Sequence, residues 1–79
     1  RLAYYRDNNG KEIDLMILEN GVIYPIEIKK SADPGKEALK NFSVLDSLPD
    51  KIGEGAVICL SPISYPLDKK NKVIPIGMV

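Results

Sequence analysis

Two Asn-Gly pairs, each between runs rich in apolar residues, constrain this chain more than any other feature. Asn9-Gly10 follows the run Leu2–Arg6, and Asn20-Gly21 separates the run 12–18 from the run 22–30. Asn-Gly between such runs is a strong hairpin signal, because both central residues of a type I′ turn need a positive φ. We therefore expect a meander of three antiparallel strands.

The middle of the chain changes from strand to helix periodicity. Asp33 is a suitable N-cap with Pro34 at the first helical position. Apolar residues then recur every three or four positions: Ala38, Leu39, Phe42, Leu45 and Leu48. This pattern predicts one amphipathic helix of roughly four turns, ending before Pro49. A polar link at 50–55, a wholly apolar strand at 56–60, a loop and a last strand at 72–79 follow.

The order strand, helix, strand places the fourth strand parallel to the third. We expect an α/β fold, with a mixed sheet of about five strands and a helix on one face. The other face is left bare, and the chain starts at Arg1. We therefore expect a missing first helix before Arg1 and interpret residues 1–79 as one domain of a longer protein. Pro25 lacks an N–H, so we expect its neighbouring strand to end or bulge there.

Composition excludes several kinds of site. The chain has 11 basic and 11 acidic residues, no His and a single Cys, Cys59, in an apolar run. A closed zinc site, a Ser-His-Asp triad and an internal disulfide are thereby excluded. With a net charge of zero, the chain also lacks the excess of basic residues expected of a domain that binds nucleic acid by itself. No apolar run approaches the ~20 residues of a membrane span, so we expect a cytoplasmic protein without membrane contact.

The second turn fixes the register of the hairpin that carries most of the charge. If Asn20 and Gly21 are its central residues, Asp14 faces Glu27 and Glu12 faces Lys29. Alternation places these four side chains on one face, with Met16, Leu18, Ile23 and Pro25 nearer the turn. The opposite face is predicted to be core: Ile13, Leu15, Ile17, Val22, Tyr24, Ile26 and Ile28.

Asp14 and Glu27 form the candidate metal site. Two carboxylates whose Cβ atoms lie ~5 Å apart across a ladder repel each other unless a cation lies between them. Mg²⁺ takes one or two carboxylates and completes its shell with water and phosphate oxygens. We expect Mg²⁺, or Mn²⁺ in its place, on Asp14 and Glu27, with Lys29 orienting a water for attack on a phosphodiester.

The sequences EIDL at 12–15 and IEIKKS at 26–31 resemble the PD-(D/E)xK nuclease superfamily. The wider run from YYRDNNGKEID at 4–14 through PIEIK at 25–29 to YPLD at 65–68 resembles the uncharacterised C-terminal domain of prokaryotic AAA-type ATPases. This resemblance covers nearly the whole chain. It implies a restriction-endonuclease-like core, which begins with a helix before the three strands, and an ATPase region preceding Arg1 in the same chain.

Carried onto this sequence, the superfamily pattern implies Asp14 and Glu27 as metal ligands and Lys29 as the catalytic lysine. Ile13 stands where the motif's name has proline. The resemblance implies a nuclease-like accessory domain with DNA as its substrate. A catalytically inactive module of the same fold, binding protein or DNA for the ATPase, is the alternative.

Plainer interpretations of these residues also remain open. In the first of them, the four charged side chains of the hairpin form a solvated strand face on which Lys29 pairs with Glu12. Lys36 and Lys40 either face phosphate or form an ordinary solvent face. Tyr4 and Tyr5 alternate in the first strand, so one is expected in the core and the other near the charged face, where it either packs or stacks on a base.

Overall fold

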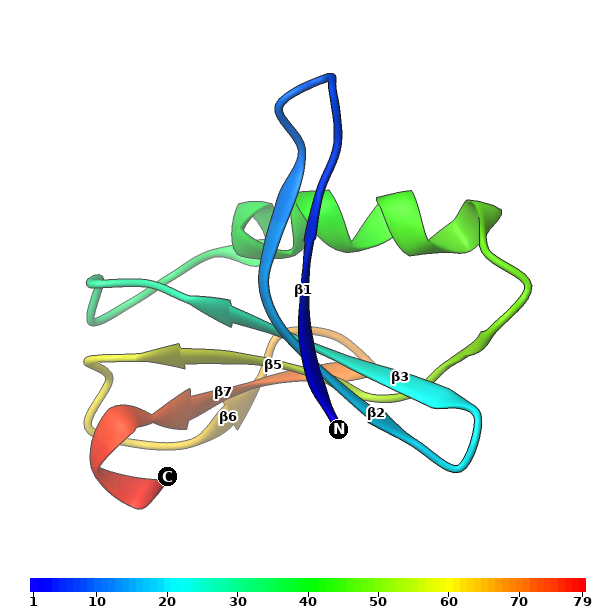
Figure 1. Ribbon diagram of the computed structural model, residues 1–79. Helices are drawn as coiled ribbons and strands as arrows, with labels where there is room; N and C mark the ends of the chain where they lie inside the picture. The colour runs from blue at the N-terminus through cyan, green and yellow to red at the C-terminus, as the bar shows by residue number, and fades with distance from the viewer.

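The computed structural model describes residues 1–79 as one mixed, seven-stranded sheet with a helix across one face (Figure 1). The strands are β1 (Leu2–Arg6), β2 (Glu12–Glu19), β3 (Val22–Ile28), β4 (Lys51–Ile52), β5 (Gly55–Cys59), β6 (Tyr65–Pro66) and β7 (Asn71–Pro75). The helices are η1 (Lys36–Ser47) and η2 (Ile76–Met78). The sheet order is β1-β2-β3-β5-β7-β6, and β4 pairs with β3. Neither helix has the length and apolar character needed to cross a membrane.

The predicted meander is present, and the β2–β3 register is as expected. Asn20 and Gly21 have φ values of 54° and 77°, as a type I′ turn requires. The ladder runs from Glu19↔Val22 to Leu15↔Ile26, so Asp14 and Glu27 come next in the same register. In the first turn only Gly10 has a positive φ, and the Asp7 carboxylate holds the loop by accepting the N–H of Asn9.

A β-bulge interrupts the alternation of β2 at Asp14. The β1–β2 partners are Leu2↔Ile17 and Ala3↔Met16 below the irregularity, then Tyr5↔Ile13 and Arg6↔Glu12 above it. Tyr4 alone therefore stands opposite two residues, Asp14 and Leu15. An extra residue in one strand reverses the faces beyond it, and Ile13 consequently shares a buried cluster with Met16.

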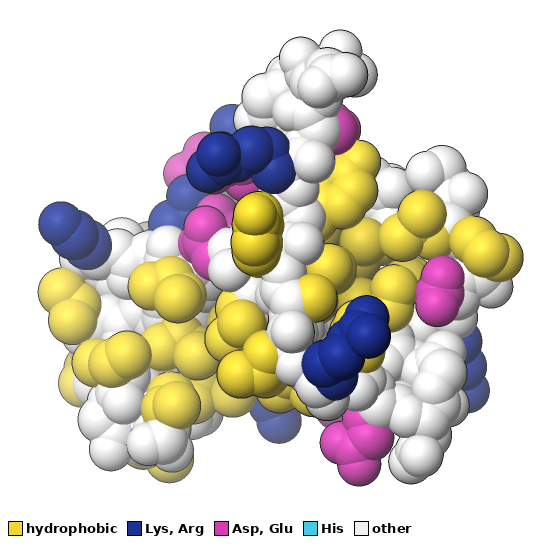
Figure 2. All heavy atoms as spheres, viewed as in Figure 1, with side chains coloured by type: hydrophobic (Ala, Val, Ile, Leu, Met, Phe, Trp, Pro, Cys, Tyr) yellow, Lys and Arg dark blue, Asp and Glu magenta, His cyan; other side chains and the backbone are white.

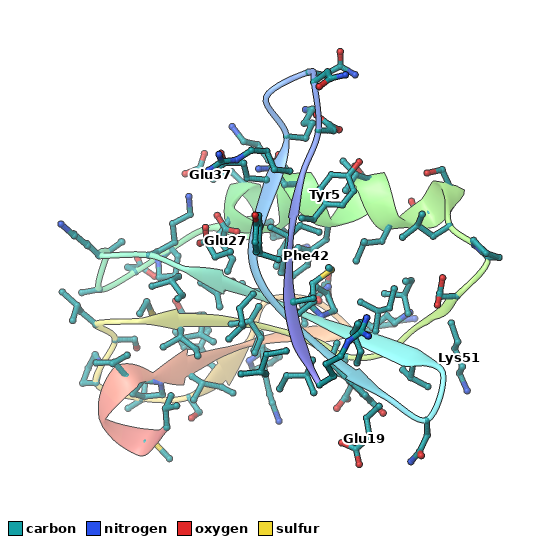
Figure 3. The ribbon with its side chains drawn as sticks, in the orientation of Figure 1. Tyr5, Glu19, Glu27, Glu37, Phe42 and Lys51 are labelled. Atoms are coloured by element: carbon teal, nitrogen blue, oxygen red, sulfur yellow. The ribbon has the colours of Figure 1, made fainter.

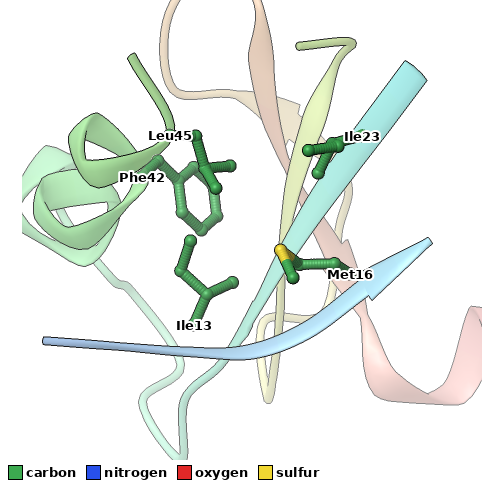
Figure 4. Packing of buried hydrophobic residues seen from close by; sticks show 5 residues of the cluster. All are labelled: Ile13, Met16, Ile23, Phe42 and Leu45. Carbon is green, nitrogen blue, oxygen red and sulfur yellow. The ribbon is translucent and has the colours of Figure 1, made fainter. Parts of the chain in front are cut away.

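The bulge and the position of the helix overturn the predicted core face. The helix covers the face that bears Met16, Ile23 and Pro25, all buried. Ile13, Met16, Ile23, Phe42 and Leu45 form one cluster between helix and sheet (Figure 4). Ala38, Val57, Cys59 and Val73 form the second. Of the predicted core face only Ile13 is buried; Leu15, Ile17, Val22, Tyr24 and Ile26 are half-buried and Ile28 is exposed.

The helix differs from prediction in type and in its start. It is a 3₁₀ helix of 12 residues that begins after Gly35, without a side-chain cap. Asp33 instead accepts a hydrogen bond from the Tyr65 hydroxyl at 3.1 Å. A 3₁₀ helix has three residues per turn, so the three-residue spacing of Leu39, Phe42 and Leu45 keeps them in line over the sheet. The end before Pro49 is as predicted.

The second half of the sheet is parallel around β5. The strand predicted at 56–60 is β5, and it lies parallel to β3 as expected. The strand predicted at 72–79 is shorter in the structure: β7 (Asn71–Pro75) lies parallel to β5, and residues 76–78 form the 3₁₀ helix η2 instead. The sheet has seven strands instead of about five, because two segments predicted as connections each form a two-residue strand. These strands are β4, in the polar link at 50–55, and β6, in the loop after β5.

Pro25 lies where its missing N–H costs little. Beside β3, β4 pairs as far as Ile23 and β5 begins pairing at Ile26. Pro25 therefore falls in the gap between these two short ladders, as the sequence predicted.

Candidate functional site

The adjacent strands β2 and β3 bring Asp14 and Glu27 together. Asp14 belongs to the bulge, and its Oδ2 accepts a hydrogen bond from the backbone N–H of Ile28 at 2.9 Å. This bond ties the Asp14 carboxylate to the end of β3 next to Glu27. In Figure 3, Glu27 lies beside β2, toward the N-terminal part of η1 that carries Glu37.

Glu27 is the unusual member of the pair, because it is a carboxylate with only 8% of its surface exposed. Its Oε1 is buried and has no hydrogen-bond partner. Its Oε2 lies 3.4 Å from Nζ of Lys29. Burial raises the pKa of Glu27, the negative charge of Asp14 raises it further, and Lys29 opposes both effects. A buried carboxylate with a bare oxygen beside a second carboxylate is an arrangement that favours a bound cation.

The predicted partner of Lys29 is different in the structure. Glu12 pairs with Arg6, whose Nε lies 3.0 Å from Glu12 Oε1, and Lys29 pairs with Glu27. The bulge explains the change, because it reverses the face on which Glu12 lies relative to the rest of β2. The predicted ion pair between Lys29 and Glu12, on which the solvated-face interpretation relied, is therefore wrong.

Two hollows border the site. One of about 240 Å³ is lined by Lys29, Ser31, Lys40 and the residues that lead into η1. The other, of about 120 Å³, is lined by Asp14 and by residues of β1 and β2. Lys36 lines neither hollow; its charge acts on Asp68, whose pKa is lowered chiefly by hydrogen bonds from the Lys70 backbone and the Asn71 side chain. The helix therefore separates the two lysines that the sequence grouped.

Of the two tyrosines of β1, Tyr4 is the one near the charged face and Tyr5 the one that packs against the core. Two further residues near the site, Arg6 and Asn41, were not assigned a place in it from the sequence. Tyr4 and Arg6 line the hollow that contains Asp14. Asn41 of η1 donates its side-chain N–H to the carbonyl oxygen of Glu12 at 2.9 Å and so anchors the helix to β2 beside the bulge. The position of Tyr4 beside the motif was a usable signal. Nothing in the local sequence indicates the Asn41 contact, which depends on how the helix docks.

The oxygen donors for a metal are those of Asp14 and Glu27. No group of three or more His, Cys, Asp or Glu side chains is arranged to hold a metal ion. A pair of carboxylates is the protein share that Mg²⁺ commonly takes, with water and phosphate oxygens completing its shell. The buried Glu27 Oε1 without a partner is the atom that most directly fits such a ligand.

The raised pKa of Glu27 predicts a specific dependence of stability on pH. A carboxyl whose pKa is raised by folding binds more protons in the folded state, so its contribution is present below its ordinary value of 4.5 and is lost as pH rises through the raised value. Glu27→Gln should therefore raise the melting temperature at about pH 7 by several degrees and by much less at about pH 4. Melts at both pH values measure the difference.

Glu37→Gln, on the helix nearby, is the matched control for that experiment. Glu37 is exposed, so its substitution should change the melting temperature little at either pH. A Glu27→Gln effect that is the same at both pH values would contradict a titrating Glu27.

No curated protein and no solved structure matches this chain. The chain does match, over residues 1–79, a family described as "Domain of unknown function (DUF4143)". Because this match spans the whole of residues 1–79, the chain belongs to the DUF4143 family.

Proposed function

We propose that the chain is a nuclease-like accessory domain of an AAA-type ATPase, with an Mg²⁺-dependent phosphodiesterase site formed by Asp14, Glu27 and Lys29. The observation that carries this proposal is the buried Glu27 carboxylate, with one oxygen unpartnered and Asp14 close enough to raise its pKa. Leaving a buried acceptor unpaired costs about 1–3 kcal/mol. A cation bound by both carboxylates would remove that cost.

The residues divide the chemistry between them. Asp14 and Glu27 would hold Mg²⁺ or Mn²⁺, which would supply Lewis-acid polarisation of a phosphodiester and lower the pKa of a water. Lys29 lines the larger hollow, where its ammonium group would orient the attacking water against the phosphate. The water oxygen bonds to phosphorus as the ester P–O bond breaks, which yields a phosphate monoester and an alcohol.

The link to DNA and to an ATPase region of the same chain rests on the resemblance to PD-(D/E)xK nucleases and to ATPase C-terminal domains. Membership of the DUF4143 family is compatible with both and assigns neither. Lys40 lines the same hollow as Lys29, together with the acidic residues Asp33 and Glu37, so the hollow itself has no excess positive charge for phosphate.

A catalytically inactive binding module is the second candidate. The formal net charge of zero favours it, because phosphate neutralisation normally supplies much of the affinity for a duplex. This candidate predicts that Asp14 and Glu27 can be replaced without loss of partner binding.

Thermal melts with and without Mg²⁺ or Mn²⁺ test the metal site directly. At ten times the dissociation constant, metal should stabilise the parent by about 1.4 kcal/mol. Asp14→Asn should abolish this effect, while its amide oxygen can still accept the Ile28 N–H. Without metal, Asp14→Asn should melt higher than the parent because the repulsion with Glu27 is gone.

Glu19→Gln is the matched control, since Glu19 is an exposed acidic residue at the opposite end of β2 (Figure 3). It should keep the full response to metal. If metal leaves the parent unchanged, or stabilises Asp14→Asn equally, the metal site is absent and the binding-module proposal takes precedence.

A further inference from the structure

Tyr4 is the most exposed aromatic side chain near the candidate site. Its surface is 72% exposed in the middle of β1, whereas the neighbouring Tyr5 packs against the core cluster. An aromatic ring held by a paired strand is a rigid platform with little conformational freedom to lose on binding. Leu2, two residues earlier on the same face, is comparably exposed at 66% and offers no planar ring.

The bulge places this ring beside Asp14. Tyr4 stands opposite Asp14 and Leu15, where β2 carries its extra residue. Tyr4, Arg6, Glu12 and Asp14 line the same hollow of about 120 Å³. Figure 2 shows basic, acidic and hydrophobic side chains meeting on one face below the β1–β2 turn. The parts of a ligand next to the group that lies on the Tyr4 ring would therefore lie close to Asp14.

The charge balance indicates which nucleic acid fits. With 11 basic and 11 acidic residues, the chain has little excess charge to follow the two phosphate backbones of a duplex. Stacking on an aromatic ring is worth about 1–3 kcal/mol per base, tolerates any base and requires the base to be unpaired. Arg6, paired with Glu12, lines the same hollow as the ring, so stacking and not net charge is the main attraction there.

We propose that Tyr4 is a stacking platform for an unpaired base of a single-stranded nucleic acid, which places the adjoining phosphodiester beside Asp14. This inference rests on the proposed phosphodiesterase function and names its substrate class. The unpaired base, and not a length of duplex, supplies the sequence-independent part of the affinity.

Fluorescence anisotropy of labelled oligonucleotides in EDTA tests the platform without metal or cleavage. The probes are a DNA single strand, an RNA single strand of the same sequence and the blunt DNA duplex. Tyr4→Ala should weaken single-strand binding by a factor of about 5 to 150, whereas Tyr4→Phe should retain it. The control Leu2→Ala should bind like the parent. The two single-strand probes distinguish a DNA from an RNA substrate.

Three outcomes would overturn the platform: equal affinity of Tyr4→Ala and parent, an equal loss in Leu2→Ala, or no single-strand binding by the parent at about 100 μM, the weak end of non-specific affinity. Failure of the phosphodiesterase proposal gives a different pattern. In that case metal leaves the parent's melting temperature unchanged, yet single-strand binding in EDTA still depends on Tyr4.

Discussion

Lys29→Met is expected to lower metal-dependent cleavage of an oligonucleotide by a factor of about 100 to 10,000, the usual contribution of a positioned proton-transfer or water-orienting group. Lys29 is expected to touch the reacting water and not the metal, so Mg²⁺ should still raise the melting temperature of this variant. Single-turnover cleavage measured alongside thermal melts separates the two effects. In Asp14→Asn, by contrast, cleavage and metal stabilisation should disappear together.

Lys30→Met is the matched control, because Lys30 is the adjacent lysine, is exposed and does not line the hollow that contains Lys29. It should cleave at close to the parent rate. Equal rates for Lys29→Met and the parent would remove Lys29 from the mechanism. Rates that fall equally in both lysine variants would point to general loss of charge instead of a positioned group.

Leu45→Ala should destabilise the fold by about 3–5 kcal/mol. Leu45 is fully buried, with 0% exposure, and packs in the cluster that joins η1 to the meander (Figure 4). At about 0.05–0.15 kcal/mol per residue, a chain of 79 residues has a total stability of about 4–12 kcal/mol. This one substitution should therefore remove a large share of the stability. Urea unfolding followed by circular dichroism measures the loss.

Leu48→Ala provides the comparison at the end of the same helix. Leu48 is 38% exposed, so its substitution leaves less of a cavity and should cost clearly less than Leu45→Ala. If the two variants lose equal stability, the helix does not pack on the sheet through the row of Leu39, Phe42 and Leu45.

The meander and its β2–β3 register were predictable because the chemistry that sets them is local. Asn20 and Gly21 adopt the positive φ values that a type I′ turn needs, and alternation then carries the register along both strands. The same reasoning brought Asp14 and Glu27 together. Lys29 also lies where predicted, two residues beyond Glu27 and next to it.

The buried face could not be predicted, because it depends on contacts between distant segments. The bulge at Asp14 moves Ile13 to the helix side, and no turn signal marks it. The side on which the helix docks decided that Met16, Ile23 and Pro25 are buried. Asp33 does not cap the helix, which begins after Gly35; its carboxylate instead accepts a hydrogen bond from the hydroxyl of Tyr65, 32 residues away.

The candidate site divides in the same way. The proximity of Asp14, Glu27 and Lys29 was predictable because all three belong to one hairpin. The burial of Glu27 was not, because it requires knowing that the helix covers this face. The exposure of Tyr4 likewise depends on the side on which the helix docks, because Tyr4 alternates along β1 with Ala3 and Tyr5, which pack against the cluster under the helix.

The two tight turns also influence the order in which this fold forms. The hairpins β1–β2 and β2–β3 pair residues close in sequence, whereas β3, β5 and β7 join only through long connections. Local pairings form early and cost less chain entropy. We therefore expect Asp14 and Glu27 to meet while the parallel half of the sheet is still unpaired and water still screens their charges. Their repulsion becomes costly late, when η1 closes over Glu27, and we expect it to act mainly by speeding unfolding.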